Sequence, residues 1–218
     1  MPNLAETILV YILILFATLY LVSIRKRYLF LSLSVCLMLS ASFAYKTIRS
    51  NEQKEIIVYH VKGNSVIQLI DGQSAILLTD TSSLKKNIFA SKMIKENSWR
   101  KQIKNTSLID IKNPNNNKFK LYKHFEYYQF YDISLVRIKN KFELPKIVKR
   151  IQVDYLIISN NARIDLEDLF NQFDCKKVIF DSSNNYFQVK KYIAAAEKLG
   201  INYYDVLTCG AFVEVISP

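Results

Sequence analysis

Hydrophobic and polar positions divide the chain into two unlike regions. The first fifty residues hold two long apolar runs, Leu4 to Ile24 and Tyr28 to Tyr45. As α-helices, these runs would extend about 31 Å and about 27 Å, enough to cross the hydrocarbon core of a bilayer. The cations Arg25 to Arg27 fill the short connection between them. The pattern predicts two transmembrane helices, over residues 4–24 and 28–45, joined as a hairpin within residues 1–50.

The charges beside the apolar runs predict how this hairpin is oriented. Cations collect on the cytoplasmic side of membrane helices, so the basic connection favours a cytoplasmic turn, although Lys46, Arg49 and Lys54 oppose that orientation. The rest of the chain is then expected on the side of the membrane opposite the cytoplasm. A cleaved signal peptide is the first alternative, but its start should be basic, and Met1 to Glu6 is not. A buried helix pair is the second, and it would need a larger soluble core.

Residues 51–218 alternate between the periods of strands and helices. Short β-branched and aromatic runs predict strands, and apolar spacings of three and four predict helices. The expected strands are 56–61, 65–70, 75–78, 108–111, 118–125, 127–131, 133–138, 154–159, 177–181, 203–207 and 212–216, and the expected helices are 84–103, 166–173 and 186–199. Asp71-Gly72 is a hairpin signal between the second and third strands. The pattern predicts one layered α/β domain with a mixed sheet over residues 51–218.

Composition excludes several kinds of functional site. The chain has two histidines, His60 and His124, together with three cysteines and four glycines. No CxxC, HxH or HExxH spacing occurs, which argues against a multi-histidine zinc site, and the isolated glycines exclude phosphate-binding loops. Three scattered cysteines give no disulfide framework. We therefore expect no metal and no cofactor, and both histidines are expected to be packed or surface residues.

Positive charge is the main chemical feature of the second region. Residues 51–218 carry 25 basic and 18 acidic side chains, a net charge of +7. Such a surplus suits weak, salt-sensitive contact with phosphates, although dispersed lysines are ordinarily solvated surface. The densest basic stretch is the candidate nucleic-acid-binding segment, which consists of Arg137, Lys139, Lys141, Lys146, Lys149 and Arg150. Aromatic residues between 122 and 131 could stack on bases, but alternation in a sheet favours a core role for them.

Four short motifs, placed after two membrane helices, carry a resemblance to a known family. They are Val61-Lys62-Gly63-Asn64-Ser65-Val66, Leu78-Thr79-Asp80-Thr81-Ser82, Phe180-Asp181-Ser182-Ser183-Asn184 and Gly210-Ala211-Phe212-Val213. The chain resembles the C-terminal end of ComEC competence proteins, the DNA-uptake channels, in the form seen in Bacteroidetes-type bacteria. In that family, the last membrane helices run into a metallo-β-lactamase-like domain. The resemblance therefore implies an α/β fold of that kind after the hairpin.

One loop departs from the metal-binding members of that fold. Those members carry an H-x-H-x-D-H motif after a strand that is matched here by Asp154 to Ile158, and no histidine follows in this chain. The positions of the resulting degenerate site are Asp80, Ser159, Asn160, Asn161, Arg163 and Asp165. The resemblance thus implies a domain with no metal and no catalytic residues. We expect Asp80 to end a strand or cap a helix, and Asp165 to lie in the first turn of the following helix.

The resemblance implies a non-catalytic accessory domain, or fragment, of a competence channel. Its expected partners are the lipid bilayer, single-stranded DNA and the remaining membrane helices of the channel. Serines and alanines make the second apolar run small-faced, which suits packing against such helices, or else leaves a lipid-facing surface with incidental serines. Two helices are too few for a DNA pore, so we expect a C-terminal fragment, a split-gene product or a truncated gene. The alternatives are a membrane-anchored interaction module without a DNA role and a membrane-tethered hydrolase or nuclease, which the missing histidines oppose.

Overall fold

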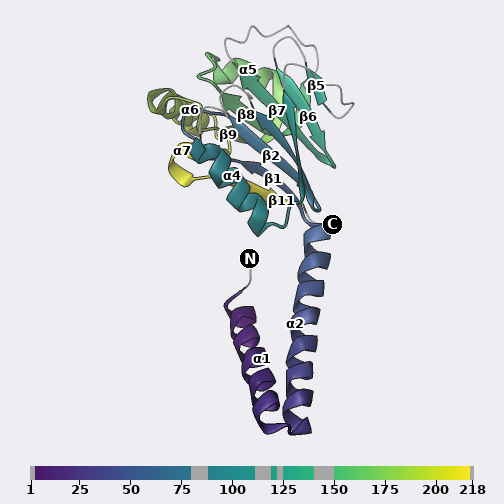
Figure 1. Ribbon diagram of the computed structural model, residues 1–218. Helices are drawn as coiled ribbons and strands as arrows, with labels where there is room; N and C mark the ends of the chain where they lie inside the picture. Colours follow the sequence, from purple (N-terminus) through teal and green to yellow (C-terminus); the bar gives the residue numbers. More distant parts are fainter. Residues whose placement is uncertain (1–2, 80–87, 111–118, 122–124, 140–149, 217–218) are drawn as a thin grey trace.

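A helical hairpin and an α/β domain make up the computed structural model, which describes residues 3–79, 88–110, 119–121, 125–139 and 150–216 (Figure 1). The hairpin consists of α1 (Leu4–Ser23) and α2 (Lys26–Glu52). Both helices are long and apolar enough to cross a membrane, and little of their surface is buried. The two predicted helices are therefore present. The second one continues beyond residue 45 as far as the domain.

Polar contacts fasten the two helices together near the start of α1. The carboxylate of Glu6 is buried and lies 2.6 Å from the ammonium of Lys46 on α2. It also accepts hydrogen bonds from the Ser42 hydroxyl at 2.7 Å and from the backbone N–H of Asn3 at 2.9 Å. A carboxylate buried between two apolar helices needs such partners, because apolar surroundings do not solvate it.

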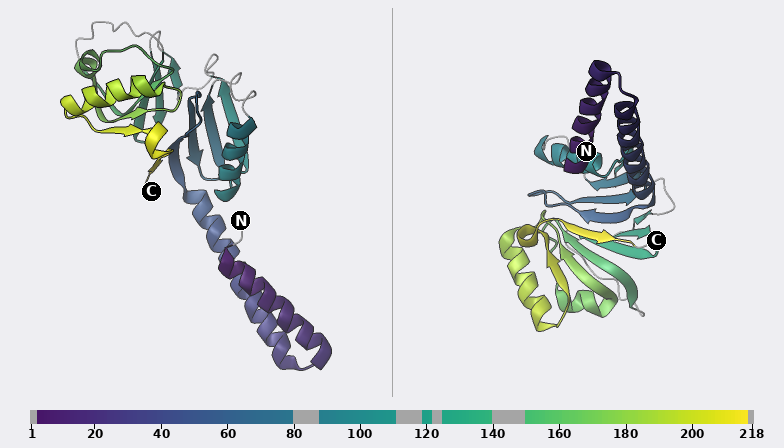
Figure 2. Two further views of the ribbon diagram at one scale, coloured as in Figure 1. Left: turned by 90° about the vertical axis from the view of Figure 1, so that its left-hand side faces the viewer. Right: turned by 90° about the horizontal axis from the view of Figure 1, so that it is seen from below.

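Two sheets build the domain, and helices cover their outer faces (Figure 2). The first sheet has the order β11-β1-β2-β3-β4, and the second has the order β10-β9-β8-β7-β6-β5. The strands of the first sheet are β1 (Lys54–Val58), β2 (Val66–Asp71), β3 (Ser74–Thr79), β4 (Asn105–Asp110) and β11 (Phe212–Val215). Those of the second are β5 (Phe119–Leu121), β6 (Glu126–Phe130), β7 (Ile133–Lys139), β8 (Ile151–Ser159), β9 (Phe173–Phe180) and β10 (Tyr203–Asp205). The helices are α4 (Ile88–Arg100), α5 (Leu166–Gln172), α6 (Tyr186–Lys198) and α7 (Val206–Cys209).

The apolar core is divided into three parts by these four layers. One part lies between the sheets and includes Ile56, Leu69 and Ile157. A second part packs the second sheet against α5 and α6, and a third packs the first sheet against α4. The expected single mixed sheet is thus corrected to two sheets, each with parallel and antiparallel pairs. The C-terminal strand β11 pairs with β1 in the first sheet, whereas β10 pairs with β9 in the second. The last two strands of the chain therefore belong to different sheets.

Individual elements mostly follow the predicted pattern. The Asp71-Gly72 turn joins β2 to β3 as expected, with Gly72 at a φ of +56°. Of the crowded aromatic residues, Phe125, Tyr128 and Phe130 are buried, which confirms the core interpretation for those three. The strand expected over residues 203–207 is shorter, because its last part forms the helical turn α7.

A tight joint connects the hairpin to the domain. Only Gln53 separates α2 from β1, and its side-chain Nε2 donates to the carbonyls of Gly72 at 2.8 Å and Lys101 at 2.7 Å. The Gly72 N–H returns a 2.8 Å bond to the Gln53 carbonyl. A Cβ at position 72 would lie 2.9 Å from the Asn51 carbonyl oxygen, so this close approach requires glycine. The β2–β3 turn therefore rests directly on the end of α2.

Candidate functional site

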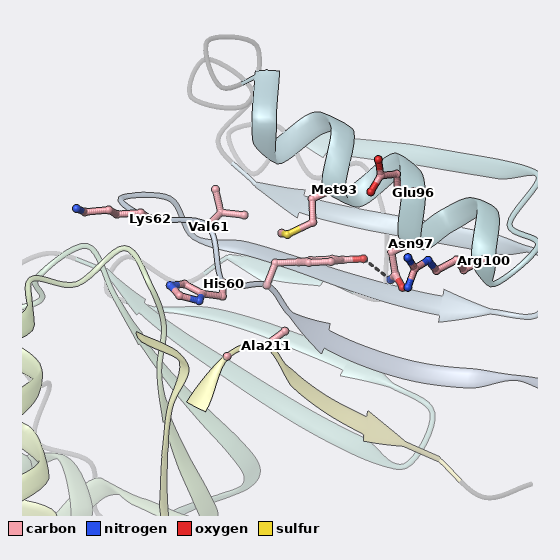
Figure 3. A pocket seen from close by; sticks show the side chains of 10 residues that line it. His60, Val61, Lys62, Met93, Glu96, Asn97, Arg100 and Ala211 are labelled. Carbon is pink, nitrogen blue, oxygen red and sulfur yellow. Dashed lines mark hydrogen bonds between the residues drawn. The ribbon is translucent and has the colours of Figure 1, made fainter. Parts of the chain in front are cut away.

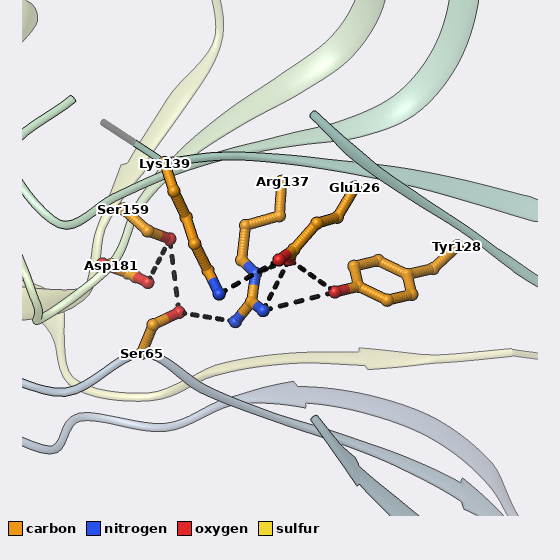
Figure 4. Close-up of polar contacts among 7 residues, drawn as sticks. All are labelled: Ser65, Glu126, Tyr128, Arg137, Lys139, Ser159 and Asp181. Atoms are coloured by element: carbon orange, nitrogen blue, oxygen red, sulfur yellow. Dashed lines mark hydrogen bonds and ion pairs between the residues drawn. The ribbon is translucent and has the colours of Figure 1, made fainter. Parts of the chain in front are cut away.

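A charged pair lies buried between the two sheets (Figure 4). Arg137 on β7 is 0% exposed, and its register partner on β6 is Glu126. The guanidinium Nε and Nη2 lie 2.6 Å and 2.5 Å from Glu126 Oε2. Strand alternation directs both side chains inward, because the neighbours Val136 and Ile138 pack on the opposite face. The pair is therefore built by the sheet register.

Neighbouring polar groups complete the surroundings of this pair. Arg137 donates to the Ser65 hydroxyl at 3.1 Å and to the Tyr128 hydroxyl at 3.2 Å, and the ammonium of Lys139 lies 3.0 Å from Glu126 Oε1. Burial acts to lower the pKa of Arg137, but Tyr128 and Glu126 hold that pKa above its usual value. For Tyr128, burial has the opposite effect and raises the pKa. The guanidinium is thus charged and the phenol is protonated.

A buried carboxyl group extends the network to the ends of β8 and β9. Ser159 donates to Asp181 Oδ2 at 2.5 Å and lies 3.2 Å from Ser65, which links Asp181 to the guanidinium side. The backbone N–H of Ser183 and the amide of Asn184 donate to Asp181 Oδ1 at 3.1 Å and 3.2 Å. Burial raises the pKa of Asp181 in spite of these donors. Each oxygen of this carboxyl group therefore faces donors from the protein itself.

The degenerate-site positions are partly brought together. Ser159 belongs to the network, while Asn160 and Asn161 fasten the loop after β8 to the loop after β9. Their N–H groups donate to Ser183 Oγ at 2.7 Å and Asn184 Oδ1 at 2.9 Å. Both asparagines have φ values in the left-handed region, which this residue type tolerates better than most. These positions thus serve to connect two loops.

The other three positions lie apart from the network or outside the description. Asp165 caps α5 by accepting from the Glu167 N–H at 2.9 Å, as expected for the start of that helix. Arg163 is exposed on the loop before it. Asp80 lies outside the described residues.

The basic stretch proposed for nucleic acids needs a correction. Arg137 is completely buried and paired with Glu126, so a phosphate on the surface cannot reach it. Lys139 is only partly exposed and its ammonium also contacts Glu126. Arg150 is exposed. Lys141, Lys146 and Lys149 lie outside the described residues, so their part of the prediction stays open.

A separate cleft of about 700 Å³ lies between α4 and the segment after β1 (Figure 3). Its lining residues are Tyr59, His60, Val61, Lys62, Met93, Glu96, Asn97, Arg100, Gly210 and Ala211. His60 is exposed at its rim, which agrees with a surface role, whereas His124 lies outside the described residues. The Tyr59 hydroxyl accepts from Asn97 at 2.6 Å, and burial raises the pKa of Tyr59 to about 12. Within the described part of the chain, no three His, Cys, Asp or Glu side chains are grouped to hold a metal ion.

Comparison with known families decides where this chain belongs. A family model described as the ComEC C-terminal domain matches residues 56–216, from β1 to the end of β11. The chain belongs to this family. The match includes both sheets and therefore all of the buried network. No curated protein and no solved structure matches the chain.

Membership gives the molecule its biological setting. ComEC proteins are membrane proteins of competence, so this ComEC C-terminal domain is linked to DNA uptake and to the membrane. The two apolar helices that precede it fit that setting.

Sequence reasoning missed the central members of the network in this ComEC C-terminal domain. Glu126 was not considered, Tyr128 was predicted to be a core residue, Asp181 and Ser183 were noted only within a family motif, and Arg137 was assigned to the surface. A signal for Arg137 was available, since this arginine interrupts the apolar run from Leu135 to Ile138. Its carboxylate partner became evident only from the pairing of β6 with β7.

The buried pair predicts a non-additive effect on stability. Replacing Arg137 with methionine should lower the free energy of unfolding by about 3–5 kcal/mol, because Glu126 would then lack its principal cation. The double variant Arg137→Met with Glu126→Gln should lose less than the sum of the two single changes. Thermal unfolding of the full chain in detergent micelles, followed by circular dichroism, measures this. Arg163→Met is the exposed control, and strictly additive losses would contradict the pairing.

Proposed function

We propose that this chain is a non-catalytic accessory part of a competence DNA-uptake channel and that it guides single-stranded DNA beside the membrane. Family membership supports the DNA-uptake setting. The observation that carries the non-catalytic role is the closed network around Arg137, in which Glu126 and Asp181 are held by donors from the protein. A hydrolase would need a carboxylate or hydroxyl group free to position water or a metal. A fixed guanidinium at this place also repels a divalent cation.

The fold itself is proposed to be a degenerate metallo-β-lactamase fold of the Bacteroidetes-type ComEC form. Two sheets packed face to face, with helices on both outer faces, support this assignment. The loop after β8, where that fold carries its histidine motif, holds Ser159, Asn160 and Asn161 instead. The side chains of Ser159 and Asn161 and the backbone N–H of Asn160 make hydrogen bonds to the end of β9 and the loop after it, which supports a structural role for these positions.

DNA contact is proposed from the surplus of positive charge. Residues 51–218 have a net charge of +7, and a polyanion is attracted by that charge without regard to base sequence. The further helices of the channel and the lipid bilayer are the other proposed partners. Both would meet α1 and α2, whose apolar surfaces are largely uncovered.

Binding of single-stranded DNA tests the proposed function directly. The full chain in neutral micelles should bind a fluorescent oligothymidylate weakly, and the affinity should fall steeply as salt is raised, because released counterions drive association. Fluorescence anisotropy between low and physiological salt measures the slope. An oligothymidylate and a mixed-sequence strand of equal length should bind alike. Absence of binding at low salt would contradict a DNA role and leave an interaction module without DNA as the better account.

Orientation gives a second test. The basic connection at Arg25–Arg27 favours a cytoplasmic turn, so the domain is proposed to lie in the periplasm. A reporter that is active only in the periplasm should give signal when fused after Pro218, and one active only in the cytoplasm should not. The same pair of reporters fused within the turn after Ile24 is the control and should give the reverse result. Cytoplasmic signal from the C-terminal fusion would overturn the orientation.

Catalytic silence gives a third test. The purified chain should contain no stoichiometric zinc or manganese by elemental analysis. Asp181→Asn should leave any background nuclease or esterase rate unchanged, because Asp181 is enclosed by protein donors. Asp165→Asn is the matched control, since asparagine is an equally good helix cap. Tight metal binding would contradict the proposed absence of a metal site, and a hydrolysis rate abolished by Asp181→Asn in a folded variant would show that the domain is an enzyme.

A further inference from the structure

Two large aromatic rings lie uncovered at the beginning of α6. Tyr186 is 49% exposed and Phe187 is 75% exposed. The opposite side of the same helix is firmly packed, because Val189, Tyr192 and Ala196 are buried in the core against the second sheet. The exposed rings therefore contribute nothing to that core. Leaving a phenylalanine in water forgoes the free energy of burying it, so the exposed pair is a candidate contact surface.

Lysines stand beside these rings. Residues four positions apart lie on one side of a helix, so Lys190 follows Tyr186 and Lys191 follows Phe187 on the exposed side. The ammonium of Lys190 is 4.8 Å from the centroid of the Tyr186 ring. The rings of Tyr186 and Phe187 are 5.9 Å apart at an interplanar angle of 70°, which leaves their faces directed differently. No acidic residue occurs in α6 before Glu197, so the first part of this helix is wholly basic in charge.

Hydrogen bonds hold the beginning of α6, which carries these two rings. Asn185 caps α6 through the N–H of Phe187, and its own N–H donates to Asn161 at 2.5 Å. Asn161 in turn binds Asn184, whose amide reaches the buried Asp181. The exposed Arg163 follows on the same loop as Asn161. The network thus fixes the backbone that carries the rings, which limits the entropy lost when a ligand orders this surface.

We propose that the outward surface formed by Tyr186, Phe187, Lys190 and Lys191, here called the α6 stacking surface, binds single-stranded DNA by stacking on its bases. Aromatic faces next to cations are the means by which proteins hold single strands without reading their sequence. This inference rests on the proposed function and names the residues that perform it. It also replaces the buried Arg137 as the place where the domain meets DNA.

The location argues against a lipid ligand for this surface. Helix α6 covers the second sheet on the side of the domain remote from the hairpin in both views of Figure 2. A bilayer crossed by α1 and α2 therefore does not reach it. Trp99 on α4 is also an exposed aromatic residue, with 59% of it exposed and the Lys95 ammonium 5.3 Å from its ring centroid. Unlike α6, however, α4 lies beside the joint with the hairpin. Trp99 is accordingly the matched control, an equally exposed aromatic–lysine pair elsewhere.

The test compares single variants of the full chain in neutral micelles, with a fluorescent oligothymidylate as the probe. Phe187→Ala and Tyr186→Ala should each weaken binding by about fivefold or more, and Trp99→Ala should leave it unchanged. Phe187→Trp should retain the affinity, since it keeps an aromatic face. Lys190→Gln with Lys191→Gln should instead reduce the salt slope by roughly 1.4, whereas the alanine variants should leave that slope unchanged.

Each outcome separates this inference from the proposed function. If the wild-type chain binds the probe and both ring variants bind equally well, the α6 stacking surface is wrong while the DNA role stands. A protein or lipid partner for the rings would then be the better account. If the wild-type chain fails to bind, the DNA role itself fails, and this inference fails with it. Thermal unfolding of each variant shows whether it is folded. If Phe187→Ala does not fold, Phe187→Gln takes its place, because it also removes the aromatic ring and puts a polar side chain at this exposed position.

Discussion

Arg137 carries a full positive charge in the space between two sheets, and much of the surrounding structure compensates that charge. Moving a guanidinium out of water is costly, and only a carboxylate with good geometry offsets the cost. Glu126 supplies that geometry from the neighbouring strand, and Ser65 reaches the guanidinium from the segment before β2. The two sheets are therefore joined by polar bonds as well as by apolar packing. The same bonds hold the carboxyl groups of Glu126 and Asp181, on which the proposal of a non-catalytic domain rests.

A second constraint acts at the other end of the domain. Helix α2 passes into β1 with a single residue between them, and Gln53 binds the β2–β3 turn and the end of α4 at once. The ion pair between Lys101 and Glu55 reinforces this junction. No long linker separates the hairpin from the first sheet. This junction therefore sets the orientation of the domain relative to the hairpin.

Local features were predictable from the sequence, and distant ones were not. The turn at Gly72 and the cap at Asp165 depend on a few adjacent residues, so residue type alone indicated them. Arg137 was misassigned because a charge is visible in the sequence whereas its partners are not. Glu126 is 11 residues away along the chain and Ser65 is 72 residues away. The separation into two sheets likewise depends on β1 pairing with β11, at the far end of the domain.

The number of basic side chains counted from the sequence overstates how many cations a polyanion meets. Arg137, Lys139 and Lys101 are paired with carboxylates inside or beside the core, so their charges are largely cancelled before DNA approaches. The attraction that remains comes from exposed cations such as Arg150, Lys190 and Lys191, and dispersed cations of this kind hold a strand weakly and release it as salt rises. In the proposed role, such weak and reversible attraction lets a strand move past the domain. Stacking on the proposed α6 stacking surface would add contact that salt does not screen, because it depends on the face of the base rather than on the phosphate.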